Sequence, residues 1–373
     1  MSSVEPAATL RSTTAATPRP TRTLPWRWIA LAAFAALLCW LPVVLIDRAI
    51  FGVRLSNMQL LNIGMTQVNL ALISVLGALS LTYLTGCAGL ISIGHAAFYA
   101  VGAIAAAITG TQWGWPFPAV LAAAALLGAV AGVLAGLPSL RVRGLYFVLS
   151  TFALHYIVVF VMAEYQYKFF DVVGIPIEEA KLGSFVLNTP MRWYFFLLVI
   201  VVLVYLGLRN TMRTREGRAL LAMRDHELAA TSAGIDVRIL RLKAFAFSSA
   251  IAAMAGALFS YYLTNVTAEF FGINFAIQFI AMIIIGGMGS LPGAVVGAFV
   301  WLMLPAVITG FAAQVGSAGD AGMFAKLLTD NKPKLVNLLF GTLVILLLIF
   351  APGGFAGLGR QMKARFLAWR APK

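Results

Sequence analysis

The sequence predicts an all-α polytopic membrane protein with about ten transmembrane helices. Of its 373 residues, 61% are hydrophobic and only 11% are charged, and the mean hydropathy is +0.92. A soluble domain of this length would carry about a quarter charged residues. Apolar runs recur from Trp28 to Phe350, and each is close to the roughly 20 residues that a helix needs to cross the hydrocarbon core of a bilayer.

The chain begins with a basic leader, residues 1–27, rich in Thr, Ala, Pro and Arg. It has no apolar periodicity, so we expect it to be disordered. The apolar run that follows, 28–46, is longer than the core of a signal peptide, and we interpret it as a first membrane anchor. The membrane domain is expected to cover 28–358, and 359–373 forms a basic tail that we place in the cytoplasm.

The remaining candidate spans are separated by short polar or glycine-rich segments. Region 276–310 is interrupted by several glycines and by Pro292, so it forms either two short spans or a broken, partly re-entrant hairpin. Irregular backbone at membrane depth needs cover from protein or from a water-filled cavity. The predicted spans after the anchor are 59–84, 89–109, 117–139, 144–163, 193–208, 243–263, 276–290, 292–310 and 335–351.

Small residues recur at helical spacing in two of these spans. Gly128, Gly132 and Gly136 follow one face of the fourth span, 117–139. The same spacing recurs in the ninth region with Gly289, Gly293 and Gly297. Such spacing lets helix backbones approach closely in lipid. We therefore predict a compact helix bundle from these glycines, and we do not interpret them as a binding site.

The orientation in the membrane follows from the basic residues. With both termini cytoplasmic, the inner segments hold 19 of the 27 Lys and Arg residues and the outer segments hold 8. Lys and Arg in short flanking segments are retained on the cytoplasmic side, which favours this orientation. The same placement accounts for the net charge of +14 without invoking nucleic acid.

A polar segment, 209–243, lies between two apolar spans and carries eight of the basic residues. Residues 216–233 are rich in helix formers, and Gly234 supplies a helix stop because glycine adopts the left-handed conformation easily. We predict one short helix suited to pressing on a protein partner; a loop that only fixes topology is the alternative. On such a helix one side would carry Leu220, Leu221, Arg224, Glu227 and Leu228, and the other Arg218, Ala222, Asp225 and Ala229.

A second informative stretch is Gly86–Ala103, which is rich in small residues. We expect a helix there that brings Ser92, His95 and Tyr99 close together beside Phe98. A single histidine in such a span either lines a polar pathway or simply bonds a backbone carbonyl. The residues alone leave both interpretations open.

Several kinds of chemistry have no motif in the sequence. The phosphate-binding pattern G-x-x-x-x-G-K-[ST], the zinc protease pattern H-E-x-x-H and the hydrolase pattern G-x-S-x-G do not occur. The two cysteines, Cys39 and Cys87, suggest neither a disulfide framework nor a zinc site, and no cofactor is expected. The span cores also lack carboxylates, which argues against a proton-driven or sodium-driven porter.

Five stretches, in this order, resemble the LivM-type permease subunits of branched-chain amino acid ABC importers. They cover most of the chain after residue 60, and the third is long and specific. They are GLISIGHAAFYAVGA (89–103), LRVRGLYFVLSTFAL (140–154), the segment 216–258, IIIGGMGSLPGAVVGA (283–298) and APGGFAGL (351–358).

The resemblance implies a multi-pass subunit of the bacterial cytoplasmic (inner) membrane that has no chemistry of its own. Besides membrane lipid, its implied partners are a second, LivH-like permease, two cytoplasmic ATPases and an extracytoplasmic solute-binding protein. It implies that 216–236 is the segment that couples to the ATPases, and we expect Ser92, His95, Phe98 and Tyr99 to face the translocation path. The residues that match the family's coupling pattern are Glu216, Gly217, Arg218, Arg224, Glu227, Ala230 and Gly234.

One stretch departs from the family and leaves the cargo open. After the fifth span, related chains usually carry a segment rich in threonine and glycine, whereas 165–185 reads YQYKFFDVVGIPIEEAKLGSF. Importers of similar build carry urea, short amides or aromatic acids, and these residues do not separate such cargos from branched-chain amino acids. From another class, the alternative is a secondary transporter or channel that works without any ATPase.

Overall fold

The computed structural model describes most of the predicted membrane domain. The predicted anchor 28–46 and both chain termini lie outside the described residues, and only isolated residues of the predicted span 335–351 are described. The described residues are 49–50, 53–54, 64–142, 144–170, 174–183, 185–317, 338, 341–342, 345, 349 and 353–357.

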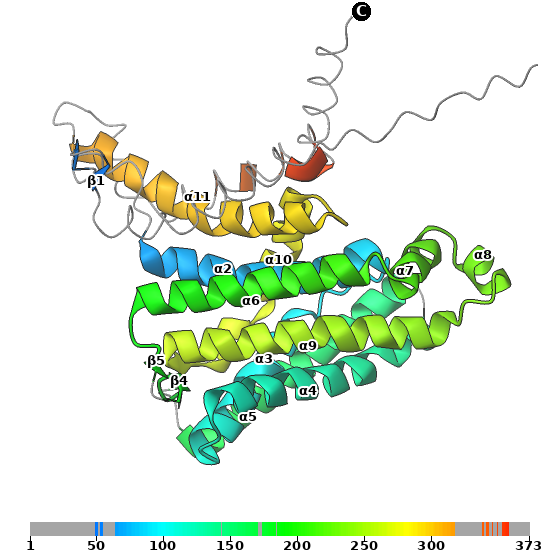
Figure 1. The fold of residues 1–373 in the computed structure, drawn as a ribbon, viewed down its shortest axis with the longest axis horizontal. Helices are drawn as coiled ribbons and strands as arrows, with labels where there is room; N and C mark the ends of the chain where they lie inside the picture. The colour runs from blue at the N-terminus through cyan, green and yellow to red at the C-terminus, as the bar shows by residue number, and fades with distance from the viewer. Residues whose placement is uncertain are drawn as a thin grey trace, which may run out of the picture.

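The described part of the chain is a bundle of apolar helices (Figure 1). Five are long and apolar enough to cross a membrane: Met65–Cys87, Phe117–Leu140, Leu145–Phe170, Pro190–Thr211 and Val237–Leu263. Three shorter apolar helices, Ala96–Gln112, Ile273–Gly286 and Leu291–Val307, fall on further predicted spans. The helical membrane class is confirmed, whereas the total of ten spans and the sides on which the termini lie stay predictions.

The elements follow one another with short connections. Each strand has two residues. Four of the six described strands lie at one end of the bundle, where β3 pairs with β6 and β4 pairs with β5. The strands are β1 Ala49–Ile50, β2 Val53–Arg54, β3 Ile175–Pro176, β4 Lys181–Leu182, β5 Phe185–Val186 and β6 Asn265–Val266. The helices are α2 Met65–Leu81 with the π-turn η2 Thr82–Cys87, α3 Ala96–Ala106 with η3 Ala107–Gln112, α4 Phe117–Gly136, η4 Pro138–Leu140, α5 Leu145–Phe170, α6 Pro190–Thr211, α7 Arg215–Asp225, α8 Glu227–Ser232, α9 Val237–Leu263, η6 Ala268–Phe271, α10 Ile273–Gly286 and α11 Leu291–Ser317.

Helix α9 forms the centre of the bundle together with α2 and α3, since most of the residues of these three helices are buried. A side chain at Gly132 of α4 would collide with Ser249 of α9, and one at Gly102 of α3 would collide with the backbone of Ala253. The absence of side chains therefore brings three helix backbones into direct contact, which is how helices associate where lipid surrounds them. We call this contact the glycine seam, and it confirms the packing role predicted for the glycines of the fourth span.

The outer helices present apolar side chains outward. In the apolar window of α2, 83% of the residues are buried, against 22% in α5. Leu126 on α4, Phe160 on α5 and Leu203 on α6 are all exposed in the described structure. Exposed apolar side chains around a buried centre are what a lipid environment favours, because hydrocarbon replaces water at that surface.

The third predicted span begins later than expected. Residues 88–95 are not helical, and α3 begins at Ala96. The chain has to reverse after α2, which Gly89 permits by adopting a positive φ of 73°. A little further on, Gly94 lies against the backbone of Thr151 of α5, where no side chain would fit. The prediction that Ser92 and His95 share a helix with Tyr99 is therefore wrong, because both precede its first residue.

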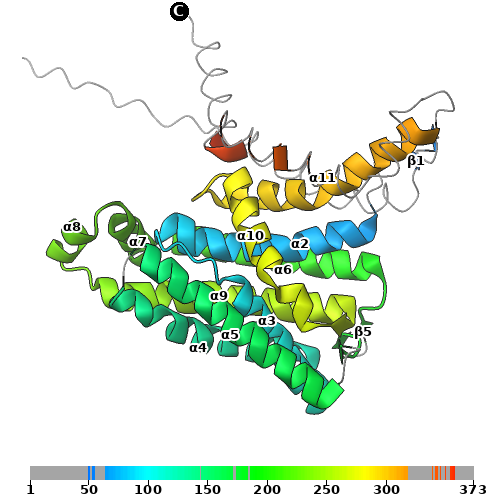
Figure 2. The ribbon, with the colours of Figure 1, turned by 180° about the vertical axis from the view of Figure 1, so that it is seen from behind.

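Region 276–310 is a helical hairpin. Helix α10 has 14 residues, and a short glycine-rich turn joins it to α11. Gly293 lies against Gly286, and Gly297 lies against Met282, so the two arms touch along their backbones. In Figure 2, which views the bundle from behind, α10 crosses in front of α2 before the chain turns into α11. With 14 residues, the first arm is shorter than the roughly 20 residues of a full crossing.

Candidate functional site

The polar segment lies at one end of the bundle, which we call the basic end; β3 to β6 lie at the other (Figure 1). Helix α7 begins at Arg215, and the hydroxyl of Thr214 accepts a hydrogen bond of 3.3 Å from the amide of Gly217. Glu216 in the first turn and Arg224 in the last complement the helix dipole. Gly217 lies so close to the end of α6 that a side chain would collide with the backbone of Thr211.

The segment forms two helices, and the prediction of one continuous helix is wrong. His226 adopts an extended conformation, with φ −150° and ψ 98°, between α7 and α8. Its carbonyl accepts a hydrogen bond from Ala230, so it begins α8 while ending α7. The two sides predicted for a single helix therefore do not exist across this break. The predicted stop is confirmed, because Gly234 has a φ of 83° and follows Ala233, the C-cap of α8.

Arg224 fixes α7 to the bundle. Its Nη1 donates a hydrogen bond of 2.6 Å to the carbonyl oxygen of Gly86, at the end of η2. A Cβ at Gly89 would lie 2.6 Å from Cγ of Arg224, so the side chain packs on bare backbone. A Cβ at Gly289, in the α10–α11 turn, would lie 3.4 Å from Nη1. Arg224 thus contacts the end of α2 and lies beside the helical hairpin.

Arg241 fixes α8 in a similar way. Its Nη2 lies 2.6 Å from Oε2 of Glu227, and its Nη1 donates a hydrogen bond of 2.7 Å to the carbonyl oxygen of Ser139. Arg241 therefore links α8 and α9 to the turn between α4 and α5. A third pair, Lys243 with Glu216, joins α9 to α7 at 2.6 Å, but both side chains are more than half exposed. Exposed pairs contribute little to stability.

The predicted loop 209–243 is shorter in the structure. Helix α9 begins at Val237, and the carboxylate of Asp236 accepts hydrogen bonds from the amides of Arg238 and Ile239 at 3.0 and 3.2 Å. The Asp-capped start is a signal that the sequence does contain. Hydropathy alone did not reveal this helix start, because Arg238, Arg241 and Lys243 make the first two turns of α9 polar.

The seven predicted coupling residues divide by what they contact. Gly217 and Ala230 are buried, and Gly234 ends α8. Arg224 and Glu227 bind the bundle. Glu216 forms the exposed pair with Lys243, and Arg218 is exposed. The partners that the sequence did not reveal are Gly86, Gly89, Ser139 and Arg241. They are distant in sequence from the segment or were interpreted only as topology signals.

The predicted path residues lie together in the core of the bundle. Ser92, His95, Phe98 and Tyr99 are each at most 2% exposed. The hydroxyl of Tyr99 donates a hydrogen bond of 3.0 Å to the carbonyl of Ile73. The ring of His95 meets that of Phe98 edge to face, with centroids 5.4 Å apart. The structure thus describes a state in which all four are closed off from solvent, and their place on a path stays a prediction.

A hydrogen bond determines the tautomer of His95. The hydroxyl of Ser80 donates to the carbonyl oxygen of Gly77 at 2.8 Å, and Nε2 of His95 lies 2.8 Å from the same hydroxyl. Because that hydroxyl has one proton, it accepts from His95, and the imidazole proton belongs on Nε2. Nδ1 of His95, then an acceptor, and the hydroxyl of Ser92, which can donate and accept, are both buried without a partner among the described residues.

Comparisons with known proteins identify relatives. Residues 65–349 match the family model of the branched-chain amino acid transport system / permease component. The high-affinity branched-chain amino acid transport system permease protein LivM of Escherichia coli is 30% identical over 249 residues, which is 59% of this chain and 58% of that protein. A probable LivM of Methanocaldococcus jannaschii is 28% identical over 236 residues, 62% of this chain and 65% of that protein.

A permease named for another cargo also matches. The autoinducer 2 import system permease protein LsrC of Yersinia enterocolitica is 26% identical over 143 residues, 36% of this chain and 38% of that protein. No solved structure gives a significant match. The chain thus spans between 58% and 65% of the length of the two LivM relatives described.

Proposed function

This chain belongs to the family of branched-chain amino acid transport system permease components, and we propose that it is the membrane-spanning permease subunit of an ATP-driven importer. As a permease family member with apolar helices, it is a multi-pass transport component and not a catalytic enzyme. The proposed cargo is a branched-chain or related amino acid, because the LivM relatives are named for such transport. Urea, short amides and aromatic acids are the alternative cargos.

The proposed soluble partners bind at opposite ends of the bundle. Two ATPases would dock at the basic end in the cytoplasm, and a solute-binding protein would deliver cargo at the end that holds β3 to β6. A second, homologous permease would complete the path within the bacterial cytoplasmic membrane. The exposed Leu228 on α8 and Ile239 at the start of α9 support docking at the basic end, because they place apolar side chains among charged ones.

The observation that carries the proposal is the way α7 and α8 are connected to the bundle. Arg224 holds the end of α2, and Arg241 joins Glu227 to the α4–α5 turn. A movement imposed on α7 and α8 would therefore reach several membrane helices at once. Packed bundles switch between discrete arrangements, so such a displacement would shift the population from one access state to the other.

Two substitutions in the coupling segment test this role. Arg218→Glu reverses an exposed charge, and Gly234→Val forces a β-branched residue to a φ of 83°, which such residues rarely adopt. We expect both to abolish ATP-dependent uptake of labelled leucine while the protein still inserts and pairs with its sister permease. The ATPases should no longer co-purify with Arg218→Glu, whereas Lys181→Glu, an exposed charge at the other end, should retain them. Unchanged uptake in both variants would remove this segment from the mechanism.

The proposed path residues have a separate test. In an otherwise cysteine-free chain, Ser92→Cys should react with a small aqueous thiol reagent in one nucleotide state and be protected in another. This expectation rests on the irregular backbone around Ser92 and on its buried hydroxyl, which has no partner in the part of the chain that the structure describes. A cysteine that stays unlabelled in every state would assign these residues to packing.

A further inference from the structure

A cavity of about 420 Å³ lies at the basic end, beside the pair formed by Arg241 and Glu227. Its walls come from the irregular segment after α2, from the α4–α5 turn with the start of α5, and from α8 and α9. Small-molecule sites in proteins typically measure about 300–1,000 Å³. The cavity is therefore large enough for a small metabolite, and the coupling role proposed above does not require it.

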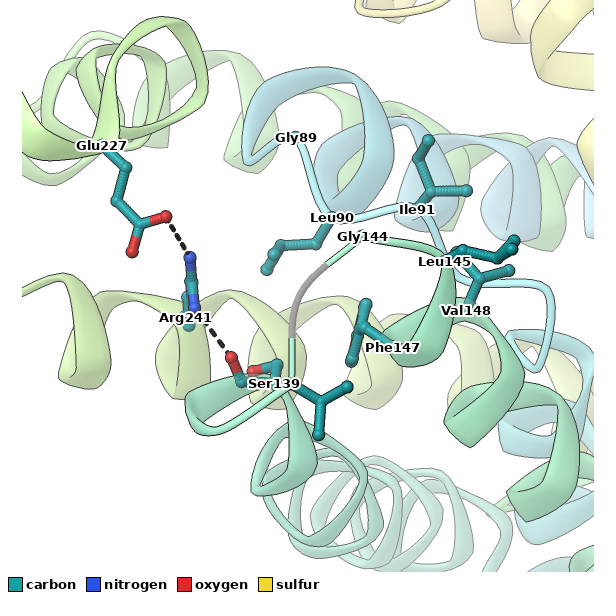
Figure 3. A pocket seen from close by; sticks show the side chains of 11 residues that line it. Gly89, Leu90, Ile91, Ser139, Gly144, Leu145, Phe147, Val148, Glu227 and Arg241 are labelled. Atoms are coloured by element: carbon teal, nitrogen blue, oxygen red, sulfur yellow. Dashed lines mark hydrogen bonds and ion pairs between the residues drawn. The ribbon is translucent and has the colours of Figure 1, made fainter.

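The cavity has two chemically different sides (Figure 3). Arg241 and Glu227 lie together on one side, while Phe147 and Val148 lie across from them and Leu90 points into the space between. The charged side carries one positive and one negative group, so its formal charge is zero. A simple anion or cation would match only half of that side. A ligand with both charges next to an apolar body would match all of it.

The guanidinium of Arg241 lines the cavity together with the carboxylate that it binds. Arg241 is 9% exposed, and its Nε is buried without a hydrogen-bond partner within the described residues, so the contact with Glu227 is made by Nη2. Hydrogen bonds between a guanidinium and a carboxylate are strong because both groups are charged. The carboxylate of a ligand would take the place of Glu227 on Nη2. An ammonium group on the same ligand would then pair with the displaced Glu227.

We propose that this cavity binds the free zwitterion of an apolar α-amino acid that enters from the basic end. The inference rests on the proposed function, because the importer's own cargo has this chemistry and accumulates on that side. Binding would replace the ion pair that ties α8 to α9, so accumulated cargo would loosen the connection between the coupling segment and the bundle. Through this site, the imported amino acid would slow further import.

The test measures protection of one cavity residue in the complete importer. Ile91 lines the cavity and is exposed, so Ile91→Cys in a chain carrying Cys39→Ser and Cys87→Ala reports on occupancy. In phosphatidylglycerol nanodiscs, saturating L-leucine should slow labelling by a thiol reagent several-fold. L-leucinamide and 4-methylpentanoate, which each lack one charge, should protect far less. Leu228→Cys, exposed and outside the cavity wall, should label at an unchanged rate.

Variants of the cavity make the test specific. Arg241→Gln and Glu227→Gln should each raise the leucine concentration needed for protection by about tenfold or more, the effect of losing a charged hydrogen bond. Because Arg241 also bonds Ser139, Val148→Phe serves as a second probe that fills the apolar side and leaves the ion pair intact. It should abolish protection. Equal protection in Val148→Phe and the parent chain would overturn the assignment.

A lipid head group is the competing zwitterion, and the nanodisc composition distinguishes it. If adding phosphatidylethanolamine slows labelling and L-leucine does not, the cavity is a lipid site and the proposal is wrong. Uptake of leucine is measured with the same preparation in proteoliposomes. Uptake without protection would remove only the cavity assignment, whereas protection without uptake would support the cavity and contradict the proposed cargo.

Discussion

The glycine seam and the basic end hold the chain together in different ways. In the seam, Gly102 and Gly132 bring α3 and α4 against α9 so closely that no side chain intervenes. At the basic end, Arg224 and Arg241 reach backbone carbonyls on other elements through long side chains. A contact between backbones leaves little freedom to shift, whereas a few long side chains permit rotation about a joint. We therefore expect the helices of the seam to move as one rigid body, and the contacts at the basic end to transmit the movement to them.

The largest effect is expected for Gly132→Leu in the seam. The added side chain would collide with Ser249 and the backbone of Phe245, and overpacking of this kind typically costs about 1–3 kcal/mol or more. We expect a large drop in the yield of monodisperse protein and in the thermal unfolding temperature. Gly207→Leu is the matched control, because none of the described residues lies within 4 Å of a Cβ at that position on α6. Equal stability of the two variants would show that the seam is not tightly packed.

Arg224→Ala is expected to destabilise the protein less than Gly132→Leu does, but to reduce uptake strongly. The variant loses the hydrogen bond to Gly86, but the side chain of Arg224 is 40% exposed, which limits the loss of stability. The protein should fold, assemble and allow ATP hydrolysis, while uptake falls at least about tenfold if the joint transmits the movement. Arg238→Ala, an exposed arginine on α9, is the control and should keep uptake. A folded Arg224→Ala variant with full uptake would separate this contact from transport.

The smallest effect is expected for Lys243→Ala. Its pair with Glu216 is 58% and 57% exposed, and pairs of this kind contribute about 0.2–1 kcal/mol. The unfolding temperature and the rate of uptake should both stay close to those of the parent protein. A loss of uptake as deep as that of Arg224→Ala would mean that the joint between α7 and α9 carries the force.

Much of the fold could be predicted because lipid imposes simple rules on sequence. Eight of the predicted spans coincide with apolar helices in the described structure, because a span must be long, apolar and helical to satisfy its backbone. The stop at Gly234 and the packing role of Gly132 were also predictable, since each depends on one residue and its local geometry.

The details of the site depended on contacts that hydropathy does not encode. The late start of α3 follows from the reversal at Gly89 and the contact of Gly94 with Thr151. The break at His226 separates α7 from α8, although the surrounding residues are good helix formers. The bond of Arg224 to Gly86 spans 138 positions of sequence. Such features become visible only when distant segments are placed side by side.

Force-driven opening is tested most directly by ATP-dependent accumulation of labelled leucine in proteoliposomes that contain the complete importer. We expect accumulation by the parent complex and none when the ATPases are omitted. We also expect Arg224→Ala complexes to hydrolyse ATP while accumulating far less leucine than the parent complex. Leucine movement by this chain without any ATPase would contradict the proposal that an external force on α7 and α8 opens the bundle.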